Sequence, residues 1–243
     1  MVRMPIALRP HGPQSNWTIL CDFDGTVALD DVVDSLLERY ALAGWESFER
    51  RWRDGQIGSL ECMRGQVELL DVGLEELNAY VDSVAVDPDF PEFVARARAL
   101  AMPLQIVSDG LDYVIRRILT RYGLGDLPVF ANEFLAADIP GRWRLNSPFA
   151  ADGCRSGTCK CALVGRAERI ELSLMIGDGA SDFCVATKAD FVFAKEKLIE
   201  YCRLEEIPHQ PITGFADAIR LLSTLTDLRQ GQSPVTSLVQ SPV

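Results

Sequence analysis

Short apolar runs that end in small polar residues recur along the chain. Residues 17–21 lead into an Asp/Gly turn, residues 104–107 into Ser-Asp-Gly, and residues 174–176 into Gly-Asp-Gly. A fourth run, residues 191–193, lies between two segments with the apolar spacing of helices. Uncharged runs of this length are typical of strands buried on both faces of a parallel sheet. Their alternation with helical segments predicts the α/β class, with an open parallel sheet covered by helices.

The interval between the first two apolar runs is too long for a loop, because structureless loops longer than about 12–15 residues are uncommon in compact domains. Helical periodicity, interrupted by glycines, predicts four helices there, over residues 30–42, 45–54, 59–70 and 73–84. We therefore expect a core domain of residues 1–28 and 87–243, and an inserted helical cap domain of residues 29–86.

Two further segments lack a regular pattern. Residues 131–159 contain Pro140, Gly141 and Pro148, which predict a short hairpin followed by a long loop. Residues 229–243 are rich in Gln, Ser, Pro and Val without periodicity. We expect a disordered tail there.

Composition narrows the possible partners. The 243 residues are 48% hydrophobic and 24% charged, which is typical of a globular protein with a sizeable core. The net charge of −11 argues against nucleic acid or an anionic membrane as a partner, because both require a concentrated positive surface. No stretch approaches the ~20 apolar residues of a membrane span. The oligomeric state, monomer or homodimer, stays open.

The seven cysteines are an odd number scattered through the chain, so they predict no disulfide framework. Residues 1–14 do not resemble a secretory signal. We therefore expect a cytoplasmic protein. Cys154, Cys159 and Cys161 are close in sequence, but no second pair lies at a suitable distance for zinc, and we assign them no role.

Two aspartates, Asp22 and Asp24, follow the first apolar run. They are expected at the carboxyl edge of the sheet, where open α/β sheets bind their ligands. Carboxylates crowded there repel one another unless a proton or a cation compensates, and Mg²⁺ prefers oxygen ligands. A carboxylate can also attack phosphorus, which divides ester hydrolysis into two displacements through an acyl phosphate. A second carboxyl group could protonate the leaving oxygen and later activate water.

An isolated Asp-x-Asp is usually a polar turn, but other strand ends carry matching chemistry. Asp178 could bind a metal, and Asp182 could be a further ligand or support one. The Ser108 hydroxyl could hold phosphoryl oxygens, and Gly110 lets the backbone approach a phosphate closely. Lys160, near the start of a predicted helix, could supply positive charge to the nucleophile and the phosphate.

In this order the motifs resemble those of the haloacid dehalogenase superfamily. The matching residues are Asp22-Phe23-Asp24-Gly25-Thr26, Ser108, Lys160 and Gly177-Asp178-Gly179-Ala180-Ser181-Asp182. The resemblance runs from about residue 17 to residue 225. It implies a Rossmann-like core with a parallel sheet and a helical cap inserted after the first strand, as in the subgroup that contains phosphoserine phosphatase.

The resemblance also implies roles and a cofactor. Asp22 would be the nucleophile and Asp24 the general acid and base. Mg²⁺ would be held by Asp22, the backbone carbonyl of Asp24, and Asp178. By the same resemblance we expect Asp31, Asp109 and Gly110 to bind the phosphate or the rest of the substrate. The implied activity is that of a phosphatase acting on a small phosphate monoester.

Finer resemblance points to more than one substrate. Ser108 to Asp112 and residues 154–160 look like the methionine-salvage branch, which predicts a small phosphorylated metabolite of that kind. Residues 177–184 equally resemble the phosphoethanolamine/phosphocholine phosphatases. Phosphoserine phosphatases read their substrate with a cap Glu and a cap Arg, where this chain has Asp31 and Gln66. A phosphorylated amine or amino acid is therefore the alternative, and a non-catalytic binding module is a remote one.

Overall fold

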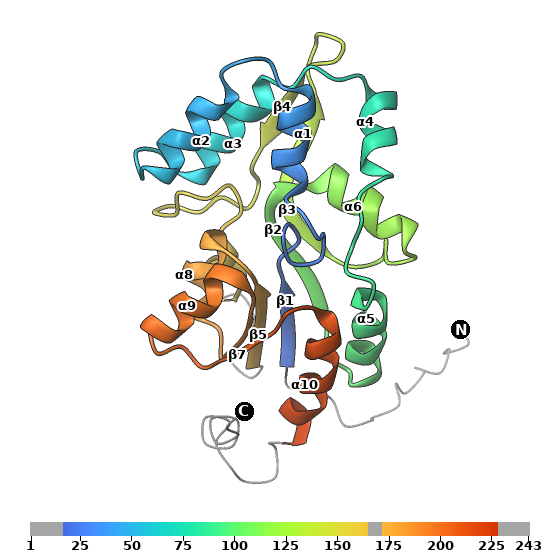
Figure 1. Cartoon of the computed structure of the whole chain (residues 1–243), viewed down its shortest axis with the longest axis vertical. Helices are drawn as coiled ribbons and strands as arrows, with labels where there is room; N and C mark the ends of the chain where they lie inside the picture. Colours follow the sequence, from blue (N-terminus) through green and yellow to red (C-terminus); the bar gives the residue numbers. More distant parts are fainter. Residues whose placement is uncertain (1–16, 165–171, 228–243) are drawn as a thin grey trace, which may run out of the picture.

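The computed structural model describes residues 17–164 and 172–227 and has an α/β fold (Figure 1). In these residues one sheet runs in the order β4-β3-β2-β1-β5-β6-β7. Its strands are β1 (Trp17–Cys21), β2 (Leu104–Leu111), β3 (Val129–Ala136), β4 (Trp143–Asn146), β5 (Leu172–Gly177), β6 (Phe191–Ala194) and β7 (His209–Pro211). Only the β3–β4 pair among these strands is antiparallel. The predicted class and the largely parallel sheet are confirmed, whereas the predicted tail, residues 229–243, lies outside the described residues.

Both faces of the sheet are buried. Ile19 of β1 belongs to the core on one face, with α5 (Phe90–Ala99), α6 (Asp112–Arg121) and α10 (Phe215–Asp227). Leu20 belongs to a second core on the other face, with α7 (Lys160–Val164), α8 (Phe183–Ala186) and α9 (Glu196–Leu204). Because successive side chains of a strand point to opposite faces, a central strand covered on both sides has few polar positions and no charged ones along its buried length. This explains the uncharged runs of the four strands that the sequence predicted.

β7 was not predicted, and β3 and β4 were predicted only as a short hairpin within residues 131–159. β3 carries Asn132 and Glu133 in its middle, which interrupt the apolar run. The expected hairpin is present as β3–β4, but β3 begins at Val129 and also pairs in parallel with β2. β7 is a three-residue edge strand with two polar residues, His209 and Gln210. Edge positions need no apolar side chains on both faces, so the pattern that marks central strands is missing.

The carboxyl end of β2 is irregular. The sequence predicted a strand over 104–107, yet β2 continues to Leu111 because Leu111 pairs again with Asn132 of β3. The register shifts between Val107 and Leu111. Such irregularities re-aim side chains at sheet edges and next to active sites. Ser108, Asp109 and Gly110 therefore belong to an irregular strand end rather than to a turn.

Four helices lie between β1 and α5, close to the predicted positions: α1 (Val32–Tyr40), α2 (Trp45–Arg53), α3 (Ser59–Glu68) and α4 (Leu74–Val81). They lie above the carboxyl edge of the sheet in Figure 1. The two connections to the sheet run side by side, since Ala28 and Val86 form an antiparallel bridge. A further short 3₁₀ helix, Ala180–Asp182, precedes α8.

The β3–β4 hairpin rises from the sheet and contacts this helical layer (Figure 1). The Trp143 indole Nε1 donates a hydrogen bond to the Val72 carbonyl at 2.9 Å, and the Val72 amide donates to the Gly141 carbonyl at 2.9 Å. The helical layer is thus held to the sheet at the hairpin as well as through its two connections. Within residues 17–164 and 172–227, no helix has both the length and the apolar character needed to cross a membrane.

Candidate active site

Asp22 occupies the first position after the central strand β1. Its amide donates to the Ile176 carbonyl at 2.9 Å, which continues the pairing of β1 with β5, and the residue is only 4% exposed. The following loop turns sharply at Gly25, whose φ is +68°. A Cβ at Gly25 would lie 2.6 Å from Asp178 Oδ2, so a side chain does not fit there. The glycine allows the loop after β1 to lie directly against the carboxylate after β5.

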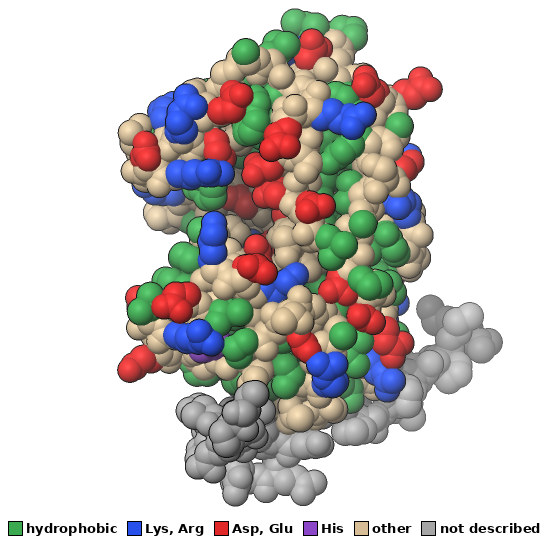
Figure 2. All heavy atoms as spheres, viewed as in Figure 1, with side chains coloured by type: hydrophobic (Ala, Val, Ile, Leu, Met, Phe, Trp, Pro, Cys, Tyr) green, Lys and Arg blue, Asp and Glu red, His purple; other side chains and the backbone are tan. Residues whose placement is uncertain are grey.

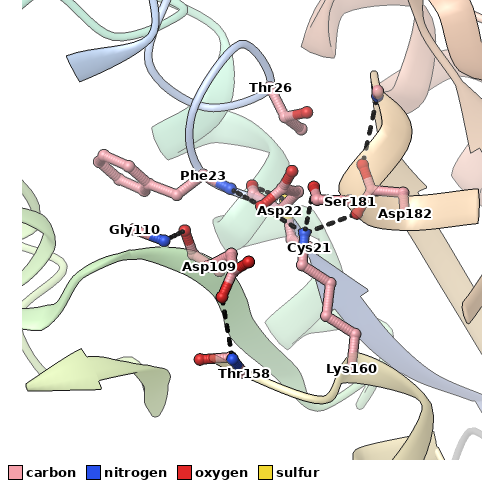
Figure 3. A network of polar contacts seen from close by, with 12 residues as sticks. Cys21, Asp22, Phe23, Thr26, Asp109, Gly110, Thr158, Lys160, Ser181 and Asp182 are labelled. Atoms are coloured by element: carbon pink, nitrogen blue, oxygen red, sulfur yellow. Dashed lines mark hydrogen bonds and ion pairs between the residues drawn. The ribbon is translucent and has the colours of Figure 1, made fainter. Parts of the chain in front are cut away.

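Lys160 brings positive charge to this edge. It is the first residue of α7 and is 1% exposed. Its Nζ lies 2.7 Å from Asp22 Oδ1 and 2.6 Å from Asp182 Oδ1, and it donates to Ser181 Oγ at 3.2 Å (Figure 3). Buried charges persist when they are paired and hydrogen-bonded. The chain thus places one ammonium group between two carboxylates from different loops.

Negative charge nevertheless dominates the site. Burial and the charge of Asp182 raise the pKa of Asp22 well above its usual value, although Lys160 opposes this. Burial and the charge of Asp31 raise the pKa of Asp24 to about 8, and burial and Asp182 raise the pKa of Asp178 to about 6. Burial lowers the pKa of Lys160, but Asp182 and Asp22 outweigh it and the net shift is upward. A cation bound here would favour the ionised carboxylates.

Three carboxylates could hold such a cation. Asp22, Asp178 and Asp182 each offer an oxygen, and these oxygens lie within 4.8 Å of one another. This is the sole group of its kind among His, Cys, Asp and Glu in the described part of the chain, so the cysteines of residues 154–161 do not form one. Asp182 already accepts from Lys160 Nζ and from the amides of Asp178 and Gly179, at 3.1 and 3.4 Å. Its oxygens are therefore more fully occupied than those of Asp178.

Ser108 and Gly110 lie next to the Asp24 carboxylate. The Ser108 side chain is 1% exposed, and its Oγ accepts a hydrogen bond from the Gly110 amide at 2.9 Å. A Cβ at Gly110 would lie 2.5 Å from Asp24 Oδ2, so only glycine permits this approach. Asp24 Oδ1 in turn accepts from the amide of Val32, the first residue of α1, at 3.0 Å. The structure thus brings together Asp22, Asp24, Ser108, Lys160 and Asp178.

The carboxylates of Asp31 and Asp109, the two other predicted site residues, accept hydrogen bonds from the protein itself. Asp31 caps α1, where its carboxylate accepts from the Asp34 amide at 2.9 Å. The carboxylate of Asp109 accepts from Ser59 of α3, from the Thr158 amide and from Asn132. The space-filling view shows acidic side chains gathered in the hollow between the helical layer and the sheet (Figure 2). That Asp31 and Asp109 contact substrate stays a prediction.

Sequence reasoning assigned no role to Lys195. This residue directly follows β6 and is 8% exposed. Its Nζ donates to the carbonyls of Gly25 and Thr26, at 2.8 and 3.3 Å. Lys195 thus holds the loop after Asp22 by its backbone. A polar residue directly after an apolar strand was the signal that found Asp22 and Asp178, and it could have found Lys195 as well.

The motifs, the sheet order and this cluster of charges define a class of hydrolase. The sequence pattern of the haloacid dehalogenase-like hydrolase family matches residues 19–187. The chain therefore belongs to that family. Its curated relatives are phosphatases, and the chain is a phosphoric monoester hydrolase.

Two curated relatives share the same name, 2-hydroxy-3-keto-5-methylthiopentenyl-1-phosphate phosphatase. The protein of Brevibacillus brevis is 29% identical over 213 residues, which span 84% of this chain and 94% of the relative. The protein of Geobacillus thermodenitrificans is 30% identical over 216 residues, which span 85% and 96%. The chain thus matches these relatives along almost their whole length.

Solved structures of phosphoserine phosphatases have the same fold. A phospho-aspartyl intermediate analogue of phosphoserine phosphatase has a TM-score of 0.64 at 19% identity, over 87% of this chain and 99% of that one. A substrate-bound phosphoserine phosphatase has a TM-score of 0.65 at 18% identity, over 88% and 99%. At these identities the likeness establishes the fold and leaves the substrate open.

Proposed function

We propose that the chain is a magnesium-dependent phosphatase that hydrolyses a small phosphate monoester through an aspartyl-phosphate intermediate. The observation that carries this proposal is the position of Lys160. Its ammonium lies 2.7 Å from Asp22, at a sheet edge that also holds Asp24, Ser108 and Asp178. A buried carboxylate paired with a buried lysine is suited to attack a phosphorus atom, because the lysine also attracts the phosphoryl oxygens.

The proposed chemistry assigns a role to each group of the site. Asp22 attacks phosphorus, and the bond from phosphorus to the leaving oxygen breaks. Asp24 gives its proton to that oxygen; its pKa of about 8 keeps the proton available at neutral pH. Asp24 then takes a proton from the water that attacks the aspartyl phosphate, and inorganic phosphate leaves. The Ser108 hydroxyl, the Gly110 amide and Lys160 hold the phosphoryl oxygens during both displacements.

The donor set fits Mg²⁺. Asp22, the backbone carbonyl of Asp24, and Asp178 would hold the ion, which supplies positive charge to balance the phosphate and the crowded carboxylates. Asp182 would hold these groups in position, because it contacts both Lys160 and the backbone amide of Asp178.

Residues 29–86 are proposed as a cap domain over a core of residues 1–28 and 87–243. The adjacent connections at Ala28 and Val86 and the position of α1 to α4 above the sheet edge support this division. A cap of this kind excludes bulk water while the aspartyl phosphate forms and contacts the organic part of the substrate.

The first candidate substrate is 2-hydroxy-3-keto-5-methylthiopentenyl-1-phosphate. Support comes from the relatives of that name, which match about 85% of the chain at about 30% identity. Because this compound carries no cationic group, its head would require apolar or hydrogen-bonding contacts from the cap.

A phosphorylated amine is the second candidate, and one observation favours it. Burial, together with the nearby charges of Asp31 and Glu49, raises the pKa of Asp34 to about 6. Burial also raises the pKa of Asp31, and the charge of Glu49 adds to this rise. A cationic head would relieve this repulsion. Phosphoethanolamine, phosphocholine and phosphoserine all carry such a head.

Phosphate release from a panel of these monoesters tests the proposal. The wild type and Asp22→Asn are assayed with Mg²⁺ and with chelator. We expect metal-dependent release that Asp22→Asn abolishes, and the preferred compound decides between the two substrate classes. Turnover that persists unchanged in Asp22→Asn would refute the nucleophile, and turnover that persists in chelator would refute the metal. Saturable binding of a panel compound without phosphate release would support the binding module instead. A cytoplasmic location stays a prediction.

A further inference from the structure

The Asp109 carboxylate joins three segments that are far apart in the sequence. Asp109 Oδ2 accepts from Ser59 Oγ, in the first residue of α3, at 2.5 Å. Asp109 Oδ1 accepts from the Thr158 amide at 2.9 Å and from Asn132 Nδ2 at 3.2 Å. Hydrogen bonds to an ionised acceptor are short and about twice as strong as neutral ones. Both oxygens are thus occupied by protein donors.

Each of these segments leads to a different part of the proposed site. Asp109 directly follows Ser108, and Thr158 lies two residues before Lys160, whose amide donates to the Thr158 carbonyl at 3.0 Å. Figure 3 shows the Asp109 carboxylate directed toward Thr158. A displacement of Asp109 would therefore move Ser108 and Lys160, two of the three groups proposed to hold the phosphoryl oxygens.

Asn132 fixes Asp109 from the sheet. This residue of β3 is 0% exposed, and its Nδ2 also donates to the Asp109 carbonyl at 2.6 Å. Its Oδ1 accepts from Ser147 Oγ at 2.6 Å. Both polar atoms of the Asn132 side chain are thus hydrogen-bonded, which fixes its orientation. Asn132 in turn holds the Asp109 side chain in a defined position beside β3.

A second contact seats α3 on the same loop. The Leu60 amide, one of the first of α3, donates to the Arg155 carbonyl at 3.0 Å. First-turn amides have no partner within a helix, so this carbonyl satisfies a group that would otherwise need water. Gly58 lies against the same backbone, and a Cβ there would collide with the Arg155 carbonyl. The amino end of α3 therefore rests on the loop that leads to Lys160.

We propose that Asp109 is a positioning residue that couples the seating of α3 to the placement of Ser108 and Lys160. This inference rests on the proposed function, because it gives the helical layer the role of a cap. When α3 is seated, Ser59 completes the set of donors to Asp109, and the segments of Ser108 and Lys160 are fixed together. The Asp109 carboxylate contacts protein donors and not the substrate.

The chemistry of an amide separates this role from a charged contact to substrate. In Asp109→Asn the carbonyl oxygen can still accept from Thr158 and Asn132, and the new NH₂ can donate to the Ser59 hydroxyl. In Asp109→Ala all three hydrogen bonds are lost. A positioning role therefore predicts that asparagine rescues most of the function, whereas a role for the negative charge predicts that asparagine fails like alanine.

Steady-state kinetics on four variants test the proposal: Asp109→Ala, Asp109→Asn, Ser59→Ala and Ser83→Ala. Ser83 is the matched control, an exposed serine after α4 whose hydroxyl bonds locally to the Tyr80 carbonyl. We expect kcat/KM to fall about tenfold or more in Asp109→Ala and about tenfold in Ser59→Ala, mainly through a higher KM, since Ser59→Ala loses one hydrogen bond to a charged group and Asp109→Ala loses all three. Asp109→Asn should stay within about twofold of wild type, and Ser83→Ala should equal it.

Amide hydrogen exchange without substrate gives a second readout that does not depend on the substrate assignment. We expect faster exchange over residues 155–160 in Ser59→Ala and Asp109→Ala, and wild-type exchange in Asp109→Asn and Ser83→Ala. The inference is overturned if Asp109→Asn is as impaired as Asp109→Ala, or if Ser59→Ala matches Ser83→Ala in both readouts. Should Asp109→Ala fail to fold, Ser59→Ala decides alone. If the panel reveals no turnover, none of its compounds is the substrate, and hydrogen exchange alone decides the coupling.

Discussion

Both sides of the proposed site carry several carboxylates, but the charges are balanced differently. On the sheet side, Lys160 is 1% exposed and lies between Asp22 and Asp182 at 2.7 and 2.6 Å. On the helical side, Asp31 and Asp34 of the α1 region lie near Glu49. The cation that pairs with Glu49 is Arg53, at 2.8 Å, and its side chain is 68% exposed.

This difference separates two kinds of electrostatic interaction. A buried ion pair is weakly screened, and removing one partner leaves an uncompensated charge, which costs several kcal/mol. An exposed pair is screened by water and contributes about 0–1 kcal/mol. A change of charge on the sheet side should therefore lower the stability strongly, whereas a change of charge on the helical side should alter it little. The sheet side is therefore suited to the catalytic chemistry that a family has in common. The helical side is suited to determine which substrate is preferred.

Replacing Lys160 should have the largest effect. Lys160→Met keeps the length of the side chain but leaves Asp22 and Asp182 buried without a positive charge. We expect the free energy of unfolding at pH 7 to fall by about 3–5 kcal/mol, the cost of breaking a buried pair. Phosphate release should fall by about 10²–10³-fold, as when one stabilising donor is removed from a catalytic site. Urea denaturation and the phosphate assay measure the two effects.

Lys197→Met is the matched control, because Lys197 is an exposed lysine in the first turn of α9. Its unfolding free energy and its turnover should both stay near those of wild type. Equal effects of the two substitutions would contradict the distinction between the buried and the exposed charges.

Replacing Lys195 should have the next largest effect. Lys195→Met removes the donor to the carbonyls of Gly25 and Thr26, and unsatisfied buried polar groups cost about 1–3 kcal/mol. Because the loop carries Asp24, turnover should fall further than stability alone explains, by about tenfold in kcat for a modest loss of positioning. Activity assayed at a urea concentration where all molecules remain folded isolates this effect. Unchanged kcat would mean that the loop keeps its geometry without Lys195.

Trp143→Phe tests how the helical layer is attached to the sheet. The variant keeps the aromatic ring that stacks on Phe134 but loses the indole donor to the Val72 carbonyl. We expect a loss of about 1–2 kcal/mol in unfolding free energy, since a buried carbonyl loses its partner. Hydrogen exchange should also become faster in residues 70–74. Unchanged exchange there would show that the hairpin does not anchor the helices.

The parts of the fold that were predictable follow one physical rule. Central strands buried on both faces must be apolar, so β1, β2, β5 and β6 could be read from the sequence, and so could the polar residues that follow them. β3 could be predicted only as part of a short hairpin, because Asn132 and Glu133 interrupt its apolar run, and its parallel pairing with β2 could not be read. The burial of Asn132 has a reason that only the fold reveals: its side chain bonds to Asp109, and Asp109 lies 23 positions away.

The site was predictable to the same extent. Asp22, Asp24, Ser108 and Asp178 lie at or just after strand ends, Lys160 begins α7, and the structure brings these residues together. For Asp109, the resemblance implied a contact with the phosphate or the rest of the substrate, which stays a prediction, and it gave no sign of the contact with α3. Its partner Ser59 lies 50 positions away in a different layer. Such a pairing depends on how the helices sit on the sheet, which local periodicity does not encode.

Asp34→Asn should have the smallest effect, and its sign is opposite to the others. Burial and the charges of Asp31 and Glu49 raise the pKa of Asp34 to about 6, from a model-peptide value of about 3.9. In the unfolded chain the carboxyl group ionises near that lower value, so between the two values the folded state binds the proton more tightly. Ionised Asp34 therefore destabilises the fold increasingly as pH rises from about 3.9 to about 6, and fully above pH 6.

The asparagine variant should be more stable than wild type above pH 6, by about 1 kcal/mol once solvent screening is allowed for, and equal to it below about pH 3.9. Thermal unfolding between pH 4 and pH 8 measures this difference, and Asp54→Asn, an exposed residue after α2, serves as the control. A variant less stable than wild type at pH 8 would mean that Asp34 is balanced by positive charge after all, like the carboxylates beside Lys160.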